Sequence, residues 1–500
     1  MLKHPSDINI KMLARKSPKN EEKLKDLMAK PNVKVVWGDL NNYDSILEGV
    51  TGSDYVLHVG GMVSPTADWK PYKTQKTNIG AAQSICKAVL AQPNPDAVKV
   101  CYIGTVAETG DRNYPIHWGR CGDPIKISIY DHYAISKTVA ERTFVESGIK
   151  NWVVMRQSGI LYPNILKNMD PIMFHVPING VLEWCTVEDS GRLMCNLVLE
   201  DKAGNLGADF WNHFYNIGSG KEYRISNYEF EQLLLGTLGL AGPEKLFEPN
   251  WFITKNFHGQ FYADGDKLEE YLHFRENLPI KDYFHRLADH VEFYFKIPRY
   301  LPKNLVAACA KPFMKKIAST PDFGTLDWVK TNNPERMSAY YGSLEEYNKI
   351  PTKWEDFKII KFDKDSSAAE QFKLDHGYDE SKPESELDIE DMKQAAKFRG
   401  VNASAKQWLR EIWLQSLSGN AALAVLNLKL HLHLFFLAVT GALNATFHRR
   451  NGTMTRLLRL TRSSLKFGIL TTLRKSIMFT SLTTSSILTV LNGTILSTKH

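Results

Sequence analysis

The chain has 500 residues, 43% of them hydrophobic, which is enough for two or three domains with their own cores. Its net charge of +7 is unevenly distributed: residues 401–500 hold 12 of the 62 basic residues and one of the 55 acidic residues, so they carry +11 and the remainder carries −4. The acidic body has no interleaved basic and aromatic surface, which argues against nucleic acid as a partner. The six cysteines form no Cys-x-x-Cys pair and have no histidines at metal-ligand spacing. We therefore expect free thiols, no metal site and a reducing, cytoplasmic location, because the polar first residues are not typical of a secretory signal.

The first half of the chain alternates predicted strands and helices. We expect strands over residues 8–14, 33–37, 54–59, 98–103 and 152–155, and helices over 21–28, 44–50, 77–91 and 127–142. Near-continuous apolar strands with helices between them predict an α/β fold, a Rossmann-like doubly wound parallel sheet. Ligands of such sheets bind at the carboxyl ends of the strands. Small and polar residues collect at those ends: Arg15, Asp39, Gly60, Gly61, Thr105 and Arg156.

The helix predicted over residues 127–142 carries Tyr133 and Lys137 on one face, with Asp131 as a plausible N-cap. A free tyrosine, with a pKa of about 10, exchanges protons poorly near neutrality. A lysine ammonium one turn further on would lower that pKa by Coulomb attraction, which would make Tyr133 a general acid or base. By itself this spacing is more typical of a solvated helix face than of a catalytic site, so the surrounding sequence has to decide between the two interpretations.

Several segments together resemble the extended short-chain dehydrogenases/reductases of the NAD-dependent epimerase/dehydratase type. They are GDL at 38–40, HVGG at 58–61, Asn78, YIGTVAETG at 102–110, YAISK at 133–137, VVMRQSGILYP at 153–163, TVEDSGRL at 186–193 and YNIGSG at 215–220. The resemblance covers residues 8–272. It implies an NAD(P)-dependent oxidoreductase, epimerase or dehydratase that acts on a carbinol or carbonyl group of a nucleotide sugar or another alcohol.

The resemblance also implies roles for individual residues. Thr105 would hydrogen-bond the substrate oxygen, Tyr133 would be the general acid/base, and Lys137 would lower the Tyr133 pKa and bind the nicotinamide ribose. The implied cofactor-binding residues are Arg15, Asp39, Leu40, Gly60, Gly61, Tyr133, Lys137, Gln157 and Ser158. Gln157 stands where the family usually has proline. Arg15 or Lys16 lies where a 2′-phosphate would bind, which favours NADP over NAD; the alternative is a solvated basic turn. Family members often dimerise through two helices that include the tyrosine helix, so a homodimer is expected.

The sequence departs from the family at its beginning. The family starts with a strand and a Gly-x-x-Gly-x-x-Gly turn that binds the pyrophosphate at a helix N-terminus, and this sequence contains neither. Residues 1–5 resemble the end of the helix that follows that turn. We therefore expect residues 1–165 to form an incomplete dinucleotide-binding domain with unpaired strand edges. The corresponding hypothesis is that Met1 is an internal methionine of a longer protein.

Residues 166–299 are expected to form a smaller α/β substrate lobe, with an amphipathic helix over 226–238 capped by Ser226. His175, Trp184 and Glu188 are candidate substrate contacts, although each is also compatible with packing. Residues 300–362 form an aromatic-rich, helical extension. There Trp328, Tyr340 and Tyr341 would form a lid, a partner surface or simply a packed core.

The last part of the chain changes character. Residues 363–400 are acidic and typical of a linker, and 401–500 form a basic tail rich in Leu, Ser and Thr. The uncharged stretches 430–447 and 476–498 are long enough to span a bilayer, although polar residues dilute both. A membrane-surface segment and an out-of-frame translation without evolved structure are the other interpretations. The alternatives to an enzyme are therefore a truncated, non-catalytic member of the fold and a membrane-associated interaction protein.

Overall fold

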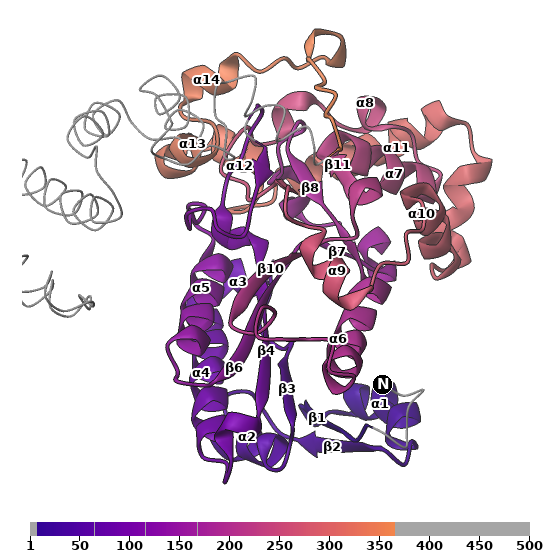
Figure 1. The fold of residues 1–500 in the computed structure, drawn as a ribbon. Helices are drawn as coiled ribbons and strands as arrows, with labels where there is room; N and C mark the ends of the chain where they lie inside the picture. The colour runs from indigo at the N-terminus through magenta and orange to yellow at the C-terminus, as the bar shows by residue number, and fades with distance from the viewer. Residues whose placement is uncertain (1–7, 65, 116, 168, 366–500) are drawn as a thin grey trace, which may run out of the picture. The chain divides into compact units, whose positions relative to one another are not determined.

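The central element is a four-stranded parallel sheet, seen in a computed structural model that describes residues 8–64, 66–115, 117–167 and 169–365. The chain divides into two compact units, residues 1–377 and 378–500, and every described residue belongs to the first. The sheet has the order β10-β6-β4-β3. Its strands are β3 (Tyr55–His58), β4 (Lys99–Thr105), β6 (Asn151–Gln157) and β10 (His213–Ile217). The predicted α/β class with a parallel sheet is confirmed (Figure 1).

Two further parallel strands form a separate ribbon. β1 (Ile10–Ala14) pairs with β2 (Val33–Trp37), and within the described residues neither is hydrogen-bonded to β3. A single continuous sheet would need a strand between β1 and β3, which is the place of the strand that the sequence was expected to lack. One edge of β1 and one edge of β3 consequently have no ladder partner in the described part of the chain.

Helices cover both faces of the four-stranded sheet. The helices of the first half are α1 (Pro18–Met28), α2 (Tyr43–Val50), α3 (Thr66–Trp69), α4 (Pro71–Leu90) and α5 (His132–Val145). Ala82 and Val89 of α4 and Phe144 of α5 pack against Val100 and Val154 of the sheet. On the other face, Leu193 and Leu197 of α6 (Val187–Lys202) pack against Val153 and Met155. This burial of both faces explains the near-continuous apolar strands.

The helix boundaries follow local capping. Asp131 accepts a hydrogen bond from the Ala134 amide at 2.7 Å, so the predicted N-cap is confirmed, but the helix begins at His132 rather than at residue 127. α4 begins at Pro71, six residues before the predicted start, because proline fits the first turn of a helix. Ser226 caps α7 (Asn227–Leu238), as predicted, and Glu229 completes a capping box with it.

The remainder of the described chain is built from short elements. The short strands pair as β5 (Trp118–Gly119) with β12 (Phe261–Tyr262), β7 (Ile160–Leu161) with β9 (Cys185–Thr186), and β8 (Val181–Glu183) with β11 (Arg224–Ser226). The later helices are α8 (Pro243–Leu246), α9 (Lys267–Leu272), α10 (Ile280–Asp289), α11 (Lys303–Ala318), α12 (Thr325–Lys330), α13 (Pro334–Tyr340) and α14 (Leu344–Asn348). The 3₁₀ turns are η1 (Pro95–Ala97), η2 (Val106–Thr109), η3 (Pro163–Lys167), η4 (Pro171–Phe174), η5 (Lys221–Tyr223), η6 (Pro249–Trp251), η7 (Phe293–Tyr300) and η8 (Trp354–Asp356).

The six cysteines are free thiols, as expected. In the described part of the chain no helix is long and apolar enough to cross a membrane. Residues 1–5, the linker after residue 365, the tail and its two uncharged stretches lie outside the described residues.

Candidate active site

The carboxyl end of β4 and the first turns of α5 bring the three predicted catalytic residues together. Thr105 is the last residue of β4, and its hydroxyl accepts a hydrogen bond from the Ala107 amide at 3.2 Å. Tyr133 lies in the first turn of α5 and is hydrogen-bonded to Thr105 through their side chains. Lys137 follows one turn later and is 6% exposed. This arrangement places one phenol and one hydroxyl at the edge where parallel sheets bind ligands.

Burial sets the acidity of the Tyr133 phenol. Its pKa is raised above the ordinary value, first by burial and then by the negative charges of Asp131 and Glu108, while the Thr105 hydrogen bond opposes the rise. The prediction that Lys137 lowers the pKa of Tyr133 is therefore wrong for this structure, because the cost of burying a phenolate exceeds any attraction to the Lys137 ammonium. The phenol is protonated at neutral pH.

Lys137 is turned toward the sheet. Its ammonium hydrogen-bonds the carbonyl oxygen of Ile103 and lies 4.4 Å from the centre of the Tyr102 ring. Burial lowers the pKa of Lys137 to about 8, and the carboxylates of Glu108 and Glu141 oppose that shift. A lysine with this pKa changes charge just above neutral pH.

The side chains of Arg15 and Asp39 are close enough to interact at the carboxyl ends of β1 and β2. The Asp39 carboxylate accepts hydrogen bonds from the Asn41 amide at 2.8 Å and from its side chain at 2.7 Å. The pKa of Asp39 is lowered, first by the bond from the Asn41 amide and also by the charges of Arg15 and Lys73. Arg15 itself is exposed. An acidic acceptor and basic groups thus lie together at this edge.

Gly60 and Gly61 follow β3, and their lack of side chains leaves space at the end of that strand. A Cβ atom on Gly60 would lie 3.1 Å from the Leu40 Cδ1 atom, and one on Gly61 would lie 3.0 Å from the Asn78 Oδ1 atom. Asn78 holds the following turn by accepting from the Met62 amide at 2.7 Å. Larger residues at these positions would crowd Leu40 and Asn78.

The end of β6 carries polar atoms without partners. Gln157 accepts a hydrogen bond from the Ser190 hydroxyl at 3.2 Å through its Oε1 atom. The Gln157 Nε2 atom and the Ser158 hydroxyl are buried and form no hydrogen bond in the structure. Buried donors of this kind are costly unless a ligand or water satisfies them.

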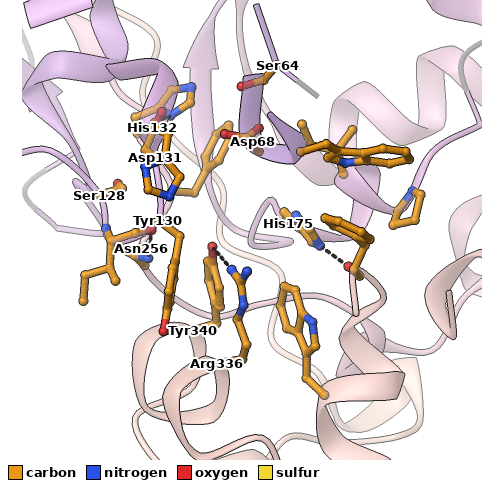
Figure 2. A pocket seen from close by; sticks show the side chains of 18 of the residues that line it. Ser64, Asp68, Ser128, Tyr130, Asp131, His132, His175, Asn256, Arg336 and Tyr340 are labelled. Atoms are coloured by element: carbon orange, nitrogen blue, oxygen red, sulfur yellow. Dashed lines mark hydrogen bonds and ion pairs between the residues drawn. The ribbon is translucent and has the colours of Figure 1, made fainter. Parts of the chain in front are cut away.

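A pocket with a volume of about 140 Å³ lies beside the N-terminus of α5 (Figure 2). Ser64 and Asp68 lie on one side of it, and Arg336 and Tyr340 lie opposite. The Arg336 guanidinium is 4.0 Å from the centre of the Tyr130 ring. In the same wall as Tyr130, Asp131 and His258 form an ion pair at 3.2 Å when the histidine is protonated. The pocket combines hydrogen-bond acceptors, one guanidinium and aromatic faces.

Comparison with known proteins shows a similarity in the first part of the chain. Residues 7–169 match the 3-beta hydroxysteroid dehydrogenase/isomerase family. This match supports the expected resemblance to the extended short-chain dehydrogenases/reductases over residues 7–169.

A curated relative, UDP-glucose 4-epimerase of Rickettsia akari, is 29% identical over 101 residues, which are 20% of this chain and 29% of the epimerase. The chain thus spans less than a third of that relative. Two solved structures are similar to this chain at low identity. One is a double mutant of dTDP-glucose 4,6-dehydratase from Streptomyces venezuelae with NAD bound (17% identity, TM-score 0.44, 56% of this chain and 86% of the dehydratase). The other is UDP-glucuronic acid 4-epimerase from Bacillus cereus with UDP-glucuronic acid and NAD (15% identity, TM-score 0.45, 58% of this chain and 92% of the epimerase).

Of the three candidate substrate contacts, one lines the pocket and two do not. His175 lines the pocket; its Nε2 atom is 2.8 Å from the Phe323 carbonyl oxygen, and burial lowers its pKa to about 4. Trp184 stacks on Phe230 at 4.6 Å between ring centres, and Glu188 accepts a hydrogen bond from the Tyr283 hydroxyl at 2.7 Å. These two residues have packing partners and do not line the pocket.

The aromatic extension contributes directly to the pocket. Trp328 and Tyr340 line it, whereas Tyr341 is 2% exposed and belongs to the core of the extension. Arg336, from the same helix as Tyr340, is a pocket residue that the sequence did not single out. Its only local signal is a cation among aromatic residues, which is common on any surface.

The sequence analysis also did not single out two buried glutamates close to Lys137, Glu108 and Glu141. The Arg156 Nη2 atom pairs with Glu141 at 2.7 Å, and its Nε atom lies 3.9 Å from Glu108. Glu108 is fully buried, and burial together with the charge of Glu141 raises its pKa well above the ordinary value. A glutamate within the otherwise small and apolar segment 104–110 was the available signal. In the described residues, no three His, Cys, Asp or Glu side chains are grouped to hold a metal ion.

Proposed function

We propose that this protein is a nicotinamide-dinucleotide-dependent oxidoreductase, of the epimerase or dehydratase type, that acts on a carbinol or carbonyl group of a nucleotide sugar. The observation that carries the proposal is the convergence of Thr105, Tyr133 and Lys137 at the carboxyl end of β4. The activity of the whole protein is part of this proposal, because the curated relative matches only 20% of this chain.

The described residues suit the two ends of a dinucleotide. Asp39 and Leu40 would contact the adenosine end, where Gly60 leaves room. The unpartnered Gln157 and Ser158 atoms suit a carboxamide group such as that of nicotinamide. Arg15 beside Asp39 supports NADP as the preferred form. A glycine-rich turn for the pyrophosphate is not among the described residues. When bound, the nicotinamide would supply or accept a hydride.

The protein's own residues would supply the proton that the substrate oxygen gains in the reaction. Because the Tyr133 phenol is protonated at neutral pH, it would donate its proton to a substrate carbonyl oxygen as that oxygen becomes an alcohol. The Thr105 hydroxyl would hydrogen-bond the same oxygen and stabilise the charge that develops on it. Lys137 would hold the cofactor ribose and, while charged, would stabilise the phenolate that Tyr133 becomes when it donates its proton.

The pocket supports a hydroxylated substrate. Asp68 and Asp131 offer acceptors for hydroxyl groups, Arg336 offers donors, and the aromatic rings offer faces for a sugar ring. An apolar substrate would leave these groups desolvated and unpaired. The UDP-glucose specificity in the name of the curated relative agrees with this choice.

The test is a fluorescence titration of the full-length protein with NADH and NADPH, followed by assays of UDP-glucose conversion with the corresponding oxidised cofactors. We expect saturable binding with a Kd on the order of micromolar, tighter for NADPH, and cofactor-dependent conversion. Absence of binding to either dinucleotide would instead support a non-catalytic member of the fold. Binding without conversion would leave the cofactor assignment intact and would reject UDP-glucose as the substrate.

A further inference from the structure

Residues 293–318, which comprise η7, a two-residue link and α11, expose an unusual number of large apolar side chains. Phe293 is 77% exposed, Tyr300 85%, Leu305 53% and Phe313 54%. Single exposed apolar residues are ordinary, but a run of them along one segment marks an interaction surface. We call this segment the 293–318 surface.

The apolar side chains of η7 are ordered in a row. A 3₁₀ helix has three residues per turn, so residues three apart lie on one face. Tyr294, Ile297 and Tyr300 have this spacing, and they are 53%, 46% and 85% exposed. Phe295, from a neighbouring row, is half-buried and packs into the core instead. η7 therefore has one apolar face that packs inward and another that does not.

α11 has the same two-sided character. Its buried face includes Met314 and Ile317, which pack into the core beside α8 (Figure 1). Leu305, Cys309 and Phe313 are exposed and recur at four-residue steps, so they form a second stripe on one face of the helix. A helix of a soluble protein normally has a polar face opposite its core-facing stripe. The second stripe of α11 thus needs a separate explanation.

The charge of the 293–318 surface has one sign. The segment contains six basic residues and no acidic residue. The six are Lys296, Arg299, Lys303, Lys311, Lys315 and Lys316. Of these, Lys311 pairs with Glu248 at 3.1 Å, and Arg299 and Lys303 bind carbonyl oxygens at the end of α7. Lys296, Lys315 and Lys316 have no ion pair among the described residues.

We propose that the 293–318 surface docks onto an anionic lipid bilayer. Exposed aromatic and aliphatic side chains beside unpaired lysines are typical of segments that lie in the plane of a membrane interface. The positive charge complements acidic lipid headgroups, whereas lysine is depleted at protein–protein interfaces. η7 and α11 would lie along the bilayer surface. The tail after residue 400 is not required for this contact.

The test is flotation of the full-length protein with phosphatidylcholine vesicles, prepared with and without phosphatidylserine. Binding should require phosphatidylserine and should weaken as salt is raised. Lys315→Glu/Lys316→Glu should weaken the partition coefficient by more than about 30-fold, since each lost charge near the surface costs about fivefold. Its matched control, Lys23→Glu/Lys25→Glu on α1, changes the net charge equally and should bind like the wild type.

The apolar contribution is tested separately. Ile297→Ser/Tyr300→Ser should weaken vesicle binding by roughly tenfold or more, because two side chains lose their contact with the lipid. Tyr72→Ser is the control, since Tyr72 is 80% exposed on α4. Melting temperatures should stay unchanged in all these variants, whose substituted side chains are solvent-exposed.

Three outcomes would overturn the proposal. The first is a wild-type protein that does not float with phosphatidylserine vesicles. The second is binding that persists in both variants of the 293–318 surface, which would assign it to another part of the chain. The third is self-association in lipid-free solution that Ile297→Ser/Tyr300→Ser abolishes, without vesicle binding, which would make this surface an interface between protein copies.

Discussion

At the scale of single residues, Tyr133 is the proposed general acid, and burial raises its pKa. Tyr133→Phe keeps the ring and removes only the hydroxyl. We expect it to lower kcat/KM for UDP-glucose by about 10²–10⁴, the usual contribution of a general acid, with little change in NADH affinity or melting temperature. Tyr72→Phe, at an exposed position, is the control. A Tyr133→Phe protein with full turnover would show that another group supplies the proton.

Glu231 tests the energetics of a buried acid at the same scale. It lies in α7, is 1% exposed, and burial raises its pKa to about 8. The folded state then holds this proton more tightly than the unfolded state, so the free energy of unfolding falls as pH rises from about 4.5 to 8. Glu231→Gln should remove this slope. Between pH 5 and pH 8 the wild type should therefore lose about 2–4 kcal/mol more of its free energy of unfolding than Glu231→Gln does. Parallel urea melts of both proteins at the two pH values measure it; identical slopes would contradict it.

At the scale of elements, Asn78 joins α4 to α5 and to the turn after β3. Its Nδ2 atom donates to the Ser136 hydroxyl at 2.8 Å and to the Met62 carbonyl at 3.0 Å. Asn78→Ala leaves these buried groups unsatisfied, so we expect a loss of about 1–3 kcal/mol in the free energy of unfolding. Gln83→Ala, on the exposed side of α4, should change it by less than about 0.5 kcal/mol. Equal effects of the two substitutions in urea unfolding would refute the role of Asn78.

At the scale of the whole described unit, a buried ion pair ties segments far apart in the sequence. Arg224 pairs with Glu183 at 2.8 Å and donates to the carbonyl oxygens of Tyr262 and Lys364. Glu183→Gln would leave the Arg224 charge uncompensated, which should cost about 3–5 kcal/mol. Glu48→Gln, which removes the exposed pair with Lys34, should cost less than about 1 kcal/mol. Thermal unfolding compares the two; a Glu183→Gln protein as stable as Glu48→Gln would show that the pair is dispensable.

The sequence by itself determined the α/β class, the helix capped by Asp131 and the helix capped by Ser226. These features depend on local patterns: apolar strands, and side chains that hydrogen-bond amides three residues away. The family resemblance also came from local segments, such as HVGG at the end of β3 and YAISK in the first turns of α5.

The tertiary structure decided what local patterns cannot encode. Whether the pKa of Tyr133 rises or falls depends on how deeply it is buried, and the four-residue spacing to Lys137 carries no information on burial. Glu108, Arg156 and Glu141 meet only because β4, β6 and α5 pack together. Arg336 reaches the pocket from a helix about 200 residues beyond Tyr133 in the chain. Non-local contacts of this kind follow from packing, and the free energy of packing is a property of the assembled core rather than of any one segment.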